Sequence, residues 1–112
     1  MIVHIILFEP RADLERSQRQ QVIDDLRSAA DSIPSVKRCR IGRRVRHGTP
    51  GYEAAMTVDY QYVVIMEFDD RAGLEAYLRH PVHHAAGRHF TMSASRALAY
   101  DYEVEEAGAF EG

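Results

Sequence analysis

The residues best suited to chemistry are a histidine and an aspartate in the C-terminal third of the sequence. His83 follows the His-Pro step at 80–81, and Asp101 lies in the last predicted strand. An imidazole ionises near pH ~6.5, so it can act as a general base, and a neighbouring carboxylate would fix its tautomer and raise its basicity. We expect Asp101 to be that partner, because it faces the helices, where a buried carboxylate needs one. The alternative is a structural pair that fastens the helix to the sheet.

A second imidazole, His4, lies in the middle of a strand that is apolar on both sides. The small side chains of Ala97 and Ala99 leave space on the helix-facing side of the last strand, which favours a cavity between sheet and helices. A hydrogen-bonded core histidine is the structural alternative for His4. Strand parity predicts that the cavity is lined by His4, Ile6, Phe8, Tyr62, Val64, Ala97 and Ala99.

A metal site would need a different arrangement of histidines. His80, His83, His84 and His89 lie close together in the sequence, but Pro81 distorts their helical spacing and the run contains no carboxylate. A transition metal needs about three ligands in a defined geometry. We therefore expect no metal and no cofactor. The single cysteine excludes an intramolecular disulfide and indicates a reducing, cytoplasmic compartment.

Composition limits the possible partners. The chain has 112 residues, 46% of them hydrophobic, and a net charge of −3, which predicts one folded domain without a general affinity for nucleic acid. The apolar opening at 2–8 is too short to span a membrane, so no membrane partner is expected. The basic segment 37–46 could bind an acidic or phosphate-bearing partner, but a solvated strand edge is the alternative, since charged edges suppress unwanted sheet pairing.

The pattern of apolar residues predicts alternating strands and helices. Strands are expected at 1–8, 36–47, 60–68 and 96–105, and helices at 13–32 and 72–95, the second divided at His80-Pro81. This order is that of an α+β, ferredoxin-like βαββαβ fold with a four-stranded antiparallel sheet. The domain would cover 1–105 and be followed by an acidic flexible tail at 106–112. Segment 47–58 is predicted to be a mobile loop near the pocket entrance.

Helices can cover only one face of such a sheet, yet the other face is also apolar. That face carries Val3, Ile5, Leu7, Val63, Ile65, Leu98, Tyr100 and Tyr102. A monomer rarely leaves so large an apolar surface in water. We therefore expect a homodimer in which an identical sheet covers it.

Several segments together resemble a known family. They are the opening Met-Ile-Val-His-Ile-Ile-Leu-Phe, the run Ser-Ile-Pro-Ser-Val at 32–36, Gly42, the run Glu-Ala-Tyr-Leu-Arg-His-Pro-Val-His at 75–83, and the closing Tyr-Asp-Tyr at 100–102. The sequence from Met1 to about Val104 resembles the stress-responsive A/B barrel family. This resemblance implies a dimeric α+β barrel, in which two four-stranded sheets form a central barrel with the helices outside.

The family contains stress-associated proteins and cofactor-independent polyketide cyclases of the olivetolic acid cyclase type. In those cyclases a tyrosine and a histidine of the second helical unit serve an aldol closure, and they match Tyr77 and His83 here. The resemblance thus implies His83 as general base and Tyr77 as hydrogen-bond donor to the enolate oxygen, and strand parity adds Asp101 as the orienting partner of His83. The cyclases have a histidine where this sequence has Tyr62, which is a poor base near neutral pH.

Two hypotheses about function remain open, because fold alone does not fix function. In the first, the protein binds a small apolar or polyketide-like molecule that bears carbonyl groups, and acts as a cyclase or related lyase. In the second, it is a non-catalytic stress-responsive or ligand-binding protein, and His83, Asp101 and Tyr77 are structural. Monooxygenases with the same barrel are a third possibility that nothing beyond the fold favours.

Overall fold

Four strands and three helices follow one another as the sequence predicts. A computed structural model describes residues 1–112 and contains strands β1 (Ile2–Pro10), β2 (Arg38–Arg43), β3 (Tyr62–Phe68) and β4 (Ala94–Glu103). The helices are α1 (Arg16–Ser32), α2 (Arg71–Arg79) and α3 (Pro81–Ser93), and short 3-10 turns lie at Glu53–Ala55 and Ala107–Ala109. The predicted ferredoxin-like α+β order is therefore confirmed.

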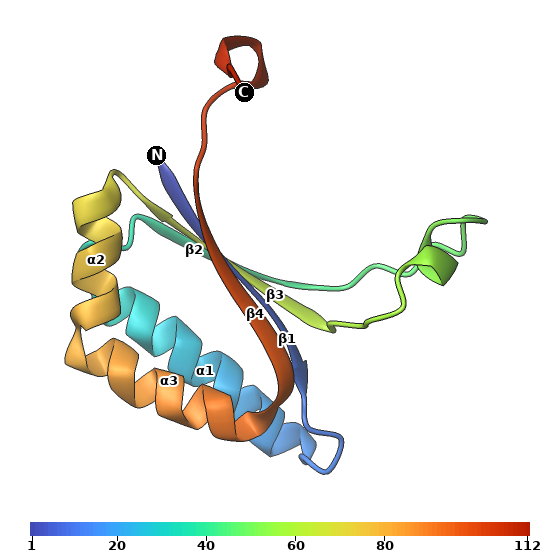
Figure 1. The fold of residues 1–112 in the computed structure, drawn as a ribbon. Coiled ribbons are helices and arrows are strands. Elements are labelled where there is room, and N and C mark those ends of the chain that lie inside the picture. Colours follow the sequence, from blue (N-terminus) through green and yellow to red (C-terminus); the bar gives the residue numbers. More distant parts are fainter.

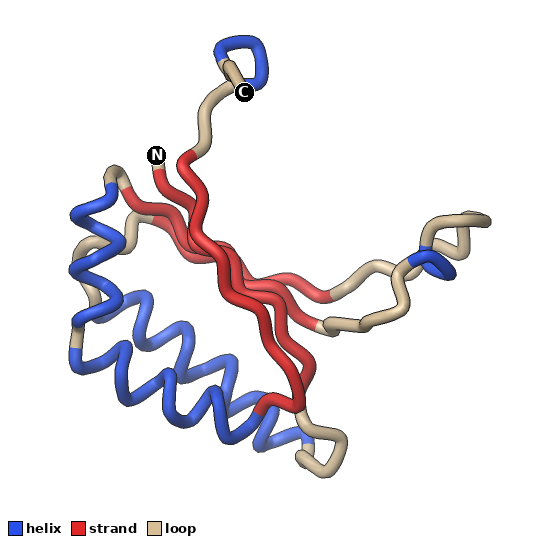
Figure 2. The backbone as a smooth tube through the Cα atoms, in the orientation of Figure 1, coloured by secondary structure: helices blue, strands red, loops and turns tan.

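The strands form one antiparallel sheet in the order β2-β3-β1-β4, so β2 and β4 are its edges. All three helices lie on one face of this sheet (Figures 1 and 2). Residues that are opposite one another in register point to the same face, and they form rows across the sheet. In one helix-facing row, Met66 of β3, His4 of β1 and Asp101 of β4 are neighbours.

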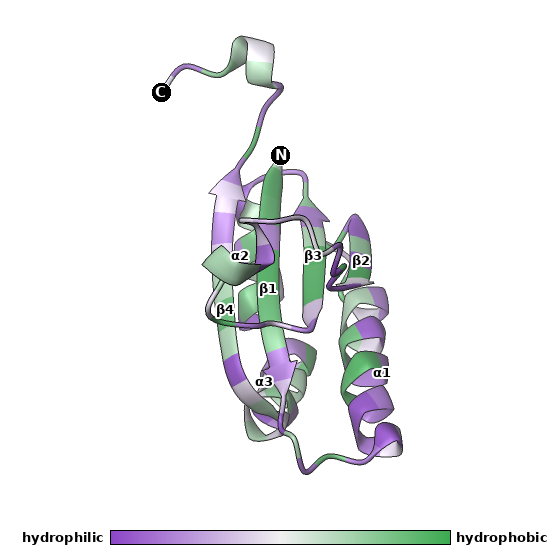
Figure 3. Cartoon of the chain, turned by 90° about the vertical axis from the view of Figure 1, so that its right-hand side faces the viewer, coloured by the Kyte–Doolittle hydropathy of each residue, from purple (hydrophilic) through white to green (hydrophobic).

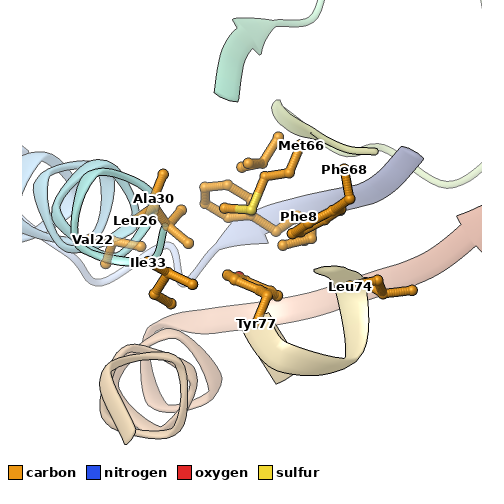
Figure 4. Packing of buried hydrophobic residues seen from close by; sticks show 11 residues of the cluster. Phe8, Val22, Leu26, Ala30, Ile33, Met66, Phe68, Leu74 and Tyr77 are labelled. Atoms are coloured by element: carbon orange, nitrogen blue, oxygen red, sulfur yellow. The ribbon is translucent and has the colours of Figure 1, made fainter. Parts of the chain in front are cut away.

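The hydrophobic core fills the space between the sheet and the helices (Figure 4). On the sheet side, Val64, Met66 and Phe68 of β3 are completely buried. The helix α1 contributes a buried stripe at helical spacing, namely Val22, Leu26, Ala29 and Ala30. Tyr77 points from α2 toward the sheet, and its side chain is part of this core. None of the helices is both long and apolar enough to cross a membrane.

The first helix begins later than expected. We predicted a start near Asp13, but α1 begins at Arg16, because the Gln18 side chain accepts a hydrogen bond of 2.8 Å from the backbone N–H of Glu15. This contact satisfies one of the amide groups that a helix start leaves without a partner. Asp13 instead binds the guanidinium of Arg11 in the preceding turn, with an Nε–Oδ1 distance of 3.0 Å.

The second helical unit is divided where the sequence predicts. His80 is extended, and its Nδ1 accepts a hydrogen bond of 3.1 Å from the backbone N–H of Val82. Pro81 occupies the first position of α3, where a helix has no use for a backbone N–H. This junction places Tyr77, in the last turns of α2, next to His83, in the first turn of α3.

The segment between β2 and β3 extends away from the helices (Figure 1). It is braced by Glu53, whose carboxylate accepts from the backbone N–H groups of His47 and Gly48, and by Asp59, which pairs with Arg44. The segment borders a hollow of about 460 Å³ on the outer side of the sheet, lined by residues that include Leu7, Met56, Val58, Tyr60 and Val63. Segment 47–58, which we expected near the entrance of a helix-side pocket, therefore lies on the other side of the sheet.

The outer face of the sheet is apolar and no helix covers it. Figure 3 views the molecule from this side and shows β1 and β3 hydrophobic over most of their length. Leu98, Tyr100 and Tyr102 of β4 are 38%, 55% and 52% exposed. The register joins them to β1, because Leu98 is opposite Leu7, Tyr100 opposite Ile5 and Tyr102 opposite Val3.

We predict that this face holds two copies of the chain together. Tyr100→Lys should weaken self-association by about 100-fold or more, because each interface would then bury an uncompensated ammonium group. Sedimentation velocity across a dilution series measures the effect. Thr91→Lys, which adds the same charge at an exposed position of α3, should leave association unchanged. A folded wild-type monomer at micromolar concentration would contradict the prediction.

Candidate functional site

The closest polar contact between strands in the core joins His4 to Asp101. His4 Nδ1 lies 2.5 Å from Asp101 Oδ1, and since a carboxylate only accepts, the imidazole nitrogen donates. The pair is a direct result of the strand register, which places the two residues opposite each other. The His4 side chain is 6% exposed and that of Asp101 is 38% exposed. The carboxylate thus connects a buried ring to the solvent-exposed edge of the sheet.

His83 has a different partner. Its Nδ1 lies 3.0 Å from the backbone carbonyl of Leu78, which can only accept, so Nδ1 carries the proton. In the neutral ring Nε2 is then the free acceptor, as a general base requires. Burial lowers the pKa of His83, and the nearby imidazoles of His4 and His84 add to this effect, while the hydrogen bond to Leu78 opposes it.

Tyr77 lies between the two histidines. Its ring centroid is 4.5 Å from that of His83 and 5.6 Å from that of His4. Burial raises the pKa of Tyr77 to about 12, with smaller contributions from Cys39 and Asp101. The hydroxyl therefore keeps its proton at neutral pH, which makes it a hydrogen-bond donor rather than a base.

The expected pairing of Asp101 with His83 was wrong. Asp101 accepts from His4, and His83 donates to Leu78 instead. The reason is that β4 is an edge strand paired with β1, so its helix-facing carboxylate meets the β1 residue opposite it before it can reach a helix. The residues of the sequence prediction still gather in one cluster, which contains His4, Tyr77, His83 and Asp101.

The residues predicted to line a cavity have several different environments. Ile6, Phe8 and Val64 are buried in the core, where the Phe8 ring packs on Tyr62 and Phe90 at 5.1 Å each. Tyr62 lines a separate cleft between α1 and β2. Ala97 and Ala99 are exposed, because the helices do not extend over the edge strand. Their small side chains leave the approach to Asp101 open along β4.

Two of the remaining histidines serve local structure. His80 accepts from the start of α3, and His89 pairs with Asp25 of α1. No three histidine, cysteine, aspartate or glutamate side chains come close enough together to hold a metal ion. The side chains of the cluster around Tyr77 can themselves offer proton transfer and hydrogen bonding.

The role of Leu78 could not be read from residue types, since it acts through its backbone carbonyl. The only signal in the sequence was Pro81, which interrupts the helix and frees carbonyl groups of the preceding turn from their usual partners. His83, one turn into α3, is close enough to use one of them.

The sequence model of the stress responsive A/B barrel domain matches residues 2–104, and the chain belongs to this family. A search of curated protein sequences found no match. The expected family is thus confirmed over almost the whole chain.

Solved structures share the fold. A dimeric ferredoxin-like protein of unknown function from Thermobifida fusca is 26% identical, with a TM-score of 0.72 over 92% of this chain and 90% of its own. A family member from Mesorhizobium loti is 23% identical, with a TM-score of 0.75 over 94% and 97% of the two chains. A hydroxynitrile lyase from Passiflora edulis is 15% identical, with a TM-score of 0.82 over 95% and 94%.

Removing the acceptor of His4 should destabilise the protein. Asp101→Ala leaves the buried His4 N–H without a partner, at an expected cost of about 1–2 kcal/mol. Urea unfolding monitored by circular dichroism measures the change. Asp69→Ala removes a carboxylate that is 70% exposed and pairs with Lys37, and it should cost less than about 0.5 kcal/mol. Equal effects of the two substitutions would contradict a structural role for the His4–Asp101 pair.

The state of His83 can be measured directly. We expect its ring protons to titrate with a midpoint below the usual value of 6.5 in an NMR pH series, because burial disfavours the imidazolium. The unfolded chain binds this proton more readily, so His83 makes stability fall as pH decreases below about 6.5. A midpoint at or above 6.5 would contradict a neutral His83.

Proposed function

We propose that this protein is a homodimeric acid–base catalyst that makes or breaks a carbon–carbon bond beside a carbonyl group, with His83 as base and Tyr77 as donor. The observation that carries the proposal is the pairing of a neutral imidazole, fixed by Leu78 with Nε2 free, with a protonated phenol whose ring lies 4.5 Å away. Such a pair supplies the proton acceptor and the oxyanion donor of an aldol-type step.

The proposed steps follow from a neutral His83, which can accept a proton, and a protonated Tyr77, which can donate a hydrogen bond. In the forward, aldol direction His83 Nε2 takes a proton from the carbon between two carbonyl groups, and the electron pair moves onto the oxygen of the enolate. The Tyr77 hydroxyl donates a hydrogen bond to that oxygen. The enolate carbon then attacks a third carbonyl, farther along the same molecule, and the resulting alkoxide takes the proton back from His83. No electrons are gained or lost overall, so no redox partner is required.

The His4–Asp101 pair would act as a positioning element. His4 packs against Tyr77, and its own orientation is fixed by the short contact to Asp101. Tyr77 also packs against Phe68 at 5.4 Å, so its ring is held on two sides. A donor that is held in place before the reaction stabilises developing charge without further reorganisation.

The substrate would enter along β4. His83 is half-buried, the Asp101 side chain is partly exposed, and Ala97 and Ala99 leave the adjoining strand surface open. The apolar surroundings of Tyr77 favour a largely apolar molecule that carries carbonyl groups, such as a polyketide-like chain.

The hydroxynitrile lyase from Passiflora edulis supports this proposal through its chemistry. Cleavage of a hydroxynitrile and retro-aldol cleavage both begin when a base removes a hydroxyl proton, after which a carbon–carbon bond breaks and a carbonyl forms. At 15% identity that structure shows the fold alone, so the activity is a proposal for this chain.

Two probes test the proposal. Mandelonitrile and a β-hydroxyketone of benzaldehyde both release benzaldehyde, which can be followed by its absorbance. His83→Ala should lower kcat about 10²- to 10⁴-fold, since general base catalysis contributes that much, and Tyr77→Phe should lower it about 10²-fold by removing one oxyanion donor. Wild-type activity should decrease only when the pH falls below the pKa of His83, which burial holds under its usual value of 6.5, because the base then gains a proton.

His47→Ala is the matched control, because His47 is an exposed histidine in the segment between β2 and β3, outside the cluster around Tyr77, and should leave kcat unchanged. If the wild type cleaves neither probe, or if His83→Ala retains full activity, the catalytic proposal fails. The non-catalytic ligand-binding hypothesis would then account for the site.

A further inference from the structure

A separate cleft opens between α1 and the edge strand β2. Its volume is about 620 Å³, and none of His4, Tyr77, His83 or Asp101 lines it. The cleft lies where β2, at the edge of the sheet, is only partly covered, so that Cys39 and Ile41 are partly exposed. It is therefore distinct from the cluster to which we assign catalysis.

The rim of the cleft is strongly basic. Arg16, Arg19 and Arg27 of α1 and Arg43 of β2 line it, against a single carboxylate, that of Asp31. The cleft thus carries an excess of three positive charges (four minus one) in a chain whose net charge is −3. Such a local field attracts anions even when the whole protein is acidic.

Three of these four arginines have no acidic partner. Arg27 pairs with Asp24 at 3.4 Å, and Arg19 donates to the backbone carbonyl of Leu14 at 3.2 Å. The ion pairs of the chain leave Arg16 and Arg43 without a carboxylate. On α1 the residue four positions after Arg16 is Gln20, so the common i,i+4 pair with an acid is absent. Arg16 belongs to α1 and Arg43 to β2, so the two guanidinium groups reach the cleft from different elements.

The floor of the cleft is apolar. Ile23 of α1, Ile41 of β2 and the ring of Tyr62 line it, and Tyr62 is held by its stacking on Phe8. The Cys39 thiol is also present, but burial and then the charge of Asp31 raise its pKa, so it stays protonated and is a poor nucleophile. This combination favours reversible binding of a molecule with an apolar body and an anionic head.

We propose that the cleft between α1 and β2 is a binding site for an amphiphilic organic anion. Its apolar body would lie on Ile23, Ile41 and Tyr62, and its oxyanion would accept hydrogen bonds from Arg16 and Arg43. Guanidinium groups suit this role, because they donate pairs of hydrogen bonds to carboxylate and phosphate oxygens alike. The site does not depend on the catalytic proposal, since it shares no residue with it.

A pair of fluorescent probes tests the proposal. Anilinonaphthalene sulfonate and phenylnaphthylamine have nearly the same aromatic body, but only the first carries an oxyanion. The wild type should bind the sulfonate at least about tenfold more tightly. The double substitution Arg16→Gln/Arg43→Gln should weaken sulfonate binding about tenfold or more and change binding of the neutral probe less than about twofold.

The matched control is Arg71→Gln/Arg88→Gln, which removes the same charge from exposed positions of α2 and α3. It should leave both affinities within about twofold of the wild type. If the cleft variant binds the sulfonate as the wild type does, or if the control loses as much affinity, the proposal is overturned. The replaced side chains are exposed. Thermal unfolding of each variant shows whether the fold is kept. Arg16→Gln alone is a milder change that tests the same site if the double variant is unstable.

Displacement of the sulfonate probe identifies the natural head group. Decanoate, decyl phosphate and decanol share one alkyl chain. Displacement by decanoate alone indicates a carboxylate ligand, and displacement by decyl phosphate alone indicates a phosphate ligand. If decanol displaces the probe as well as both anions do, the arginines do not select for charge and the proposal fails.

Discussion

Both faces of the four-stranded sheet are apolar, and the helices of one chain can cover only one of them. The core on the helix side and the bare outer side are therefore built from alternate residues of the same strands. A shift of one residue in register would exchange the two faces. On the helix side, His4 of β1 and Asp101 of β4 are accommodated because the register makes them each other's partner.

The order of the elements could be predicted because it depends on local patterns. Alternating apolar residues marked the strands, and the His80-Pro81 step marked where one helix ends and the next begins. The partner of Asp101 could not be predicted in this way. His4 and Asp101 are 97 positions apart, and their meeting depends on how the turns set the register of β1 and β4. The sequence placed both on the helix-facing side, but it did not align the strands.

The two edges of the sheet differ in chemistry. At the β4 edge, the Asp101 carboxylate and two imidazoles lie around the buried phenol of Tyr77. The two imidazoles differ in the group that accepts their hydrogen bond. His4 donates to a charged carboxylate, whereas His83 donates to a neutral carbonyl. At the β2 edge, arginines surround an apolar floor. Ala97 and Ala99 suggested an enclosed cavity, but on an edge strand small side chains produce an open surface instead.

The position of β4 at the edge of the sheet links dimer formation to the hydrogen bond between His4 and Asp101. This strand has a hydrogen-bonded neighbour on one side only, and its residues from Ser95 to Glu103 are exposed. Such strands detach locally at a lower free-energy cost than global unfolding. Each detachment would take the Asp101 carboxylate away from His4 and leave a buried ring without its acceptor. A second copy packed on Tyr100 would suppress these openings. Dimer formation on one face of the sheet would then act allosterically on the other face, because it would increase the fraction of molecules in which His4 keeps its hydrogen bond to Asp101.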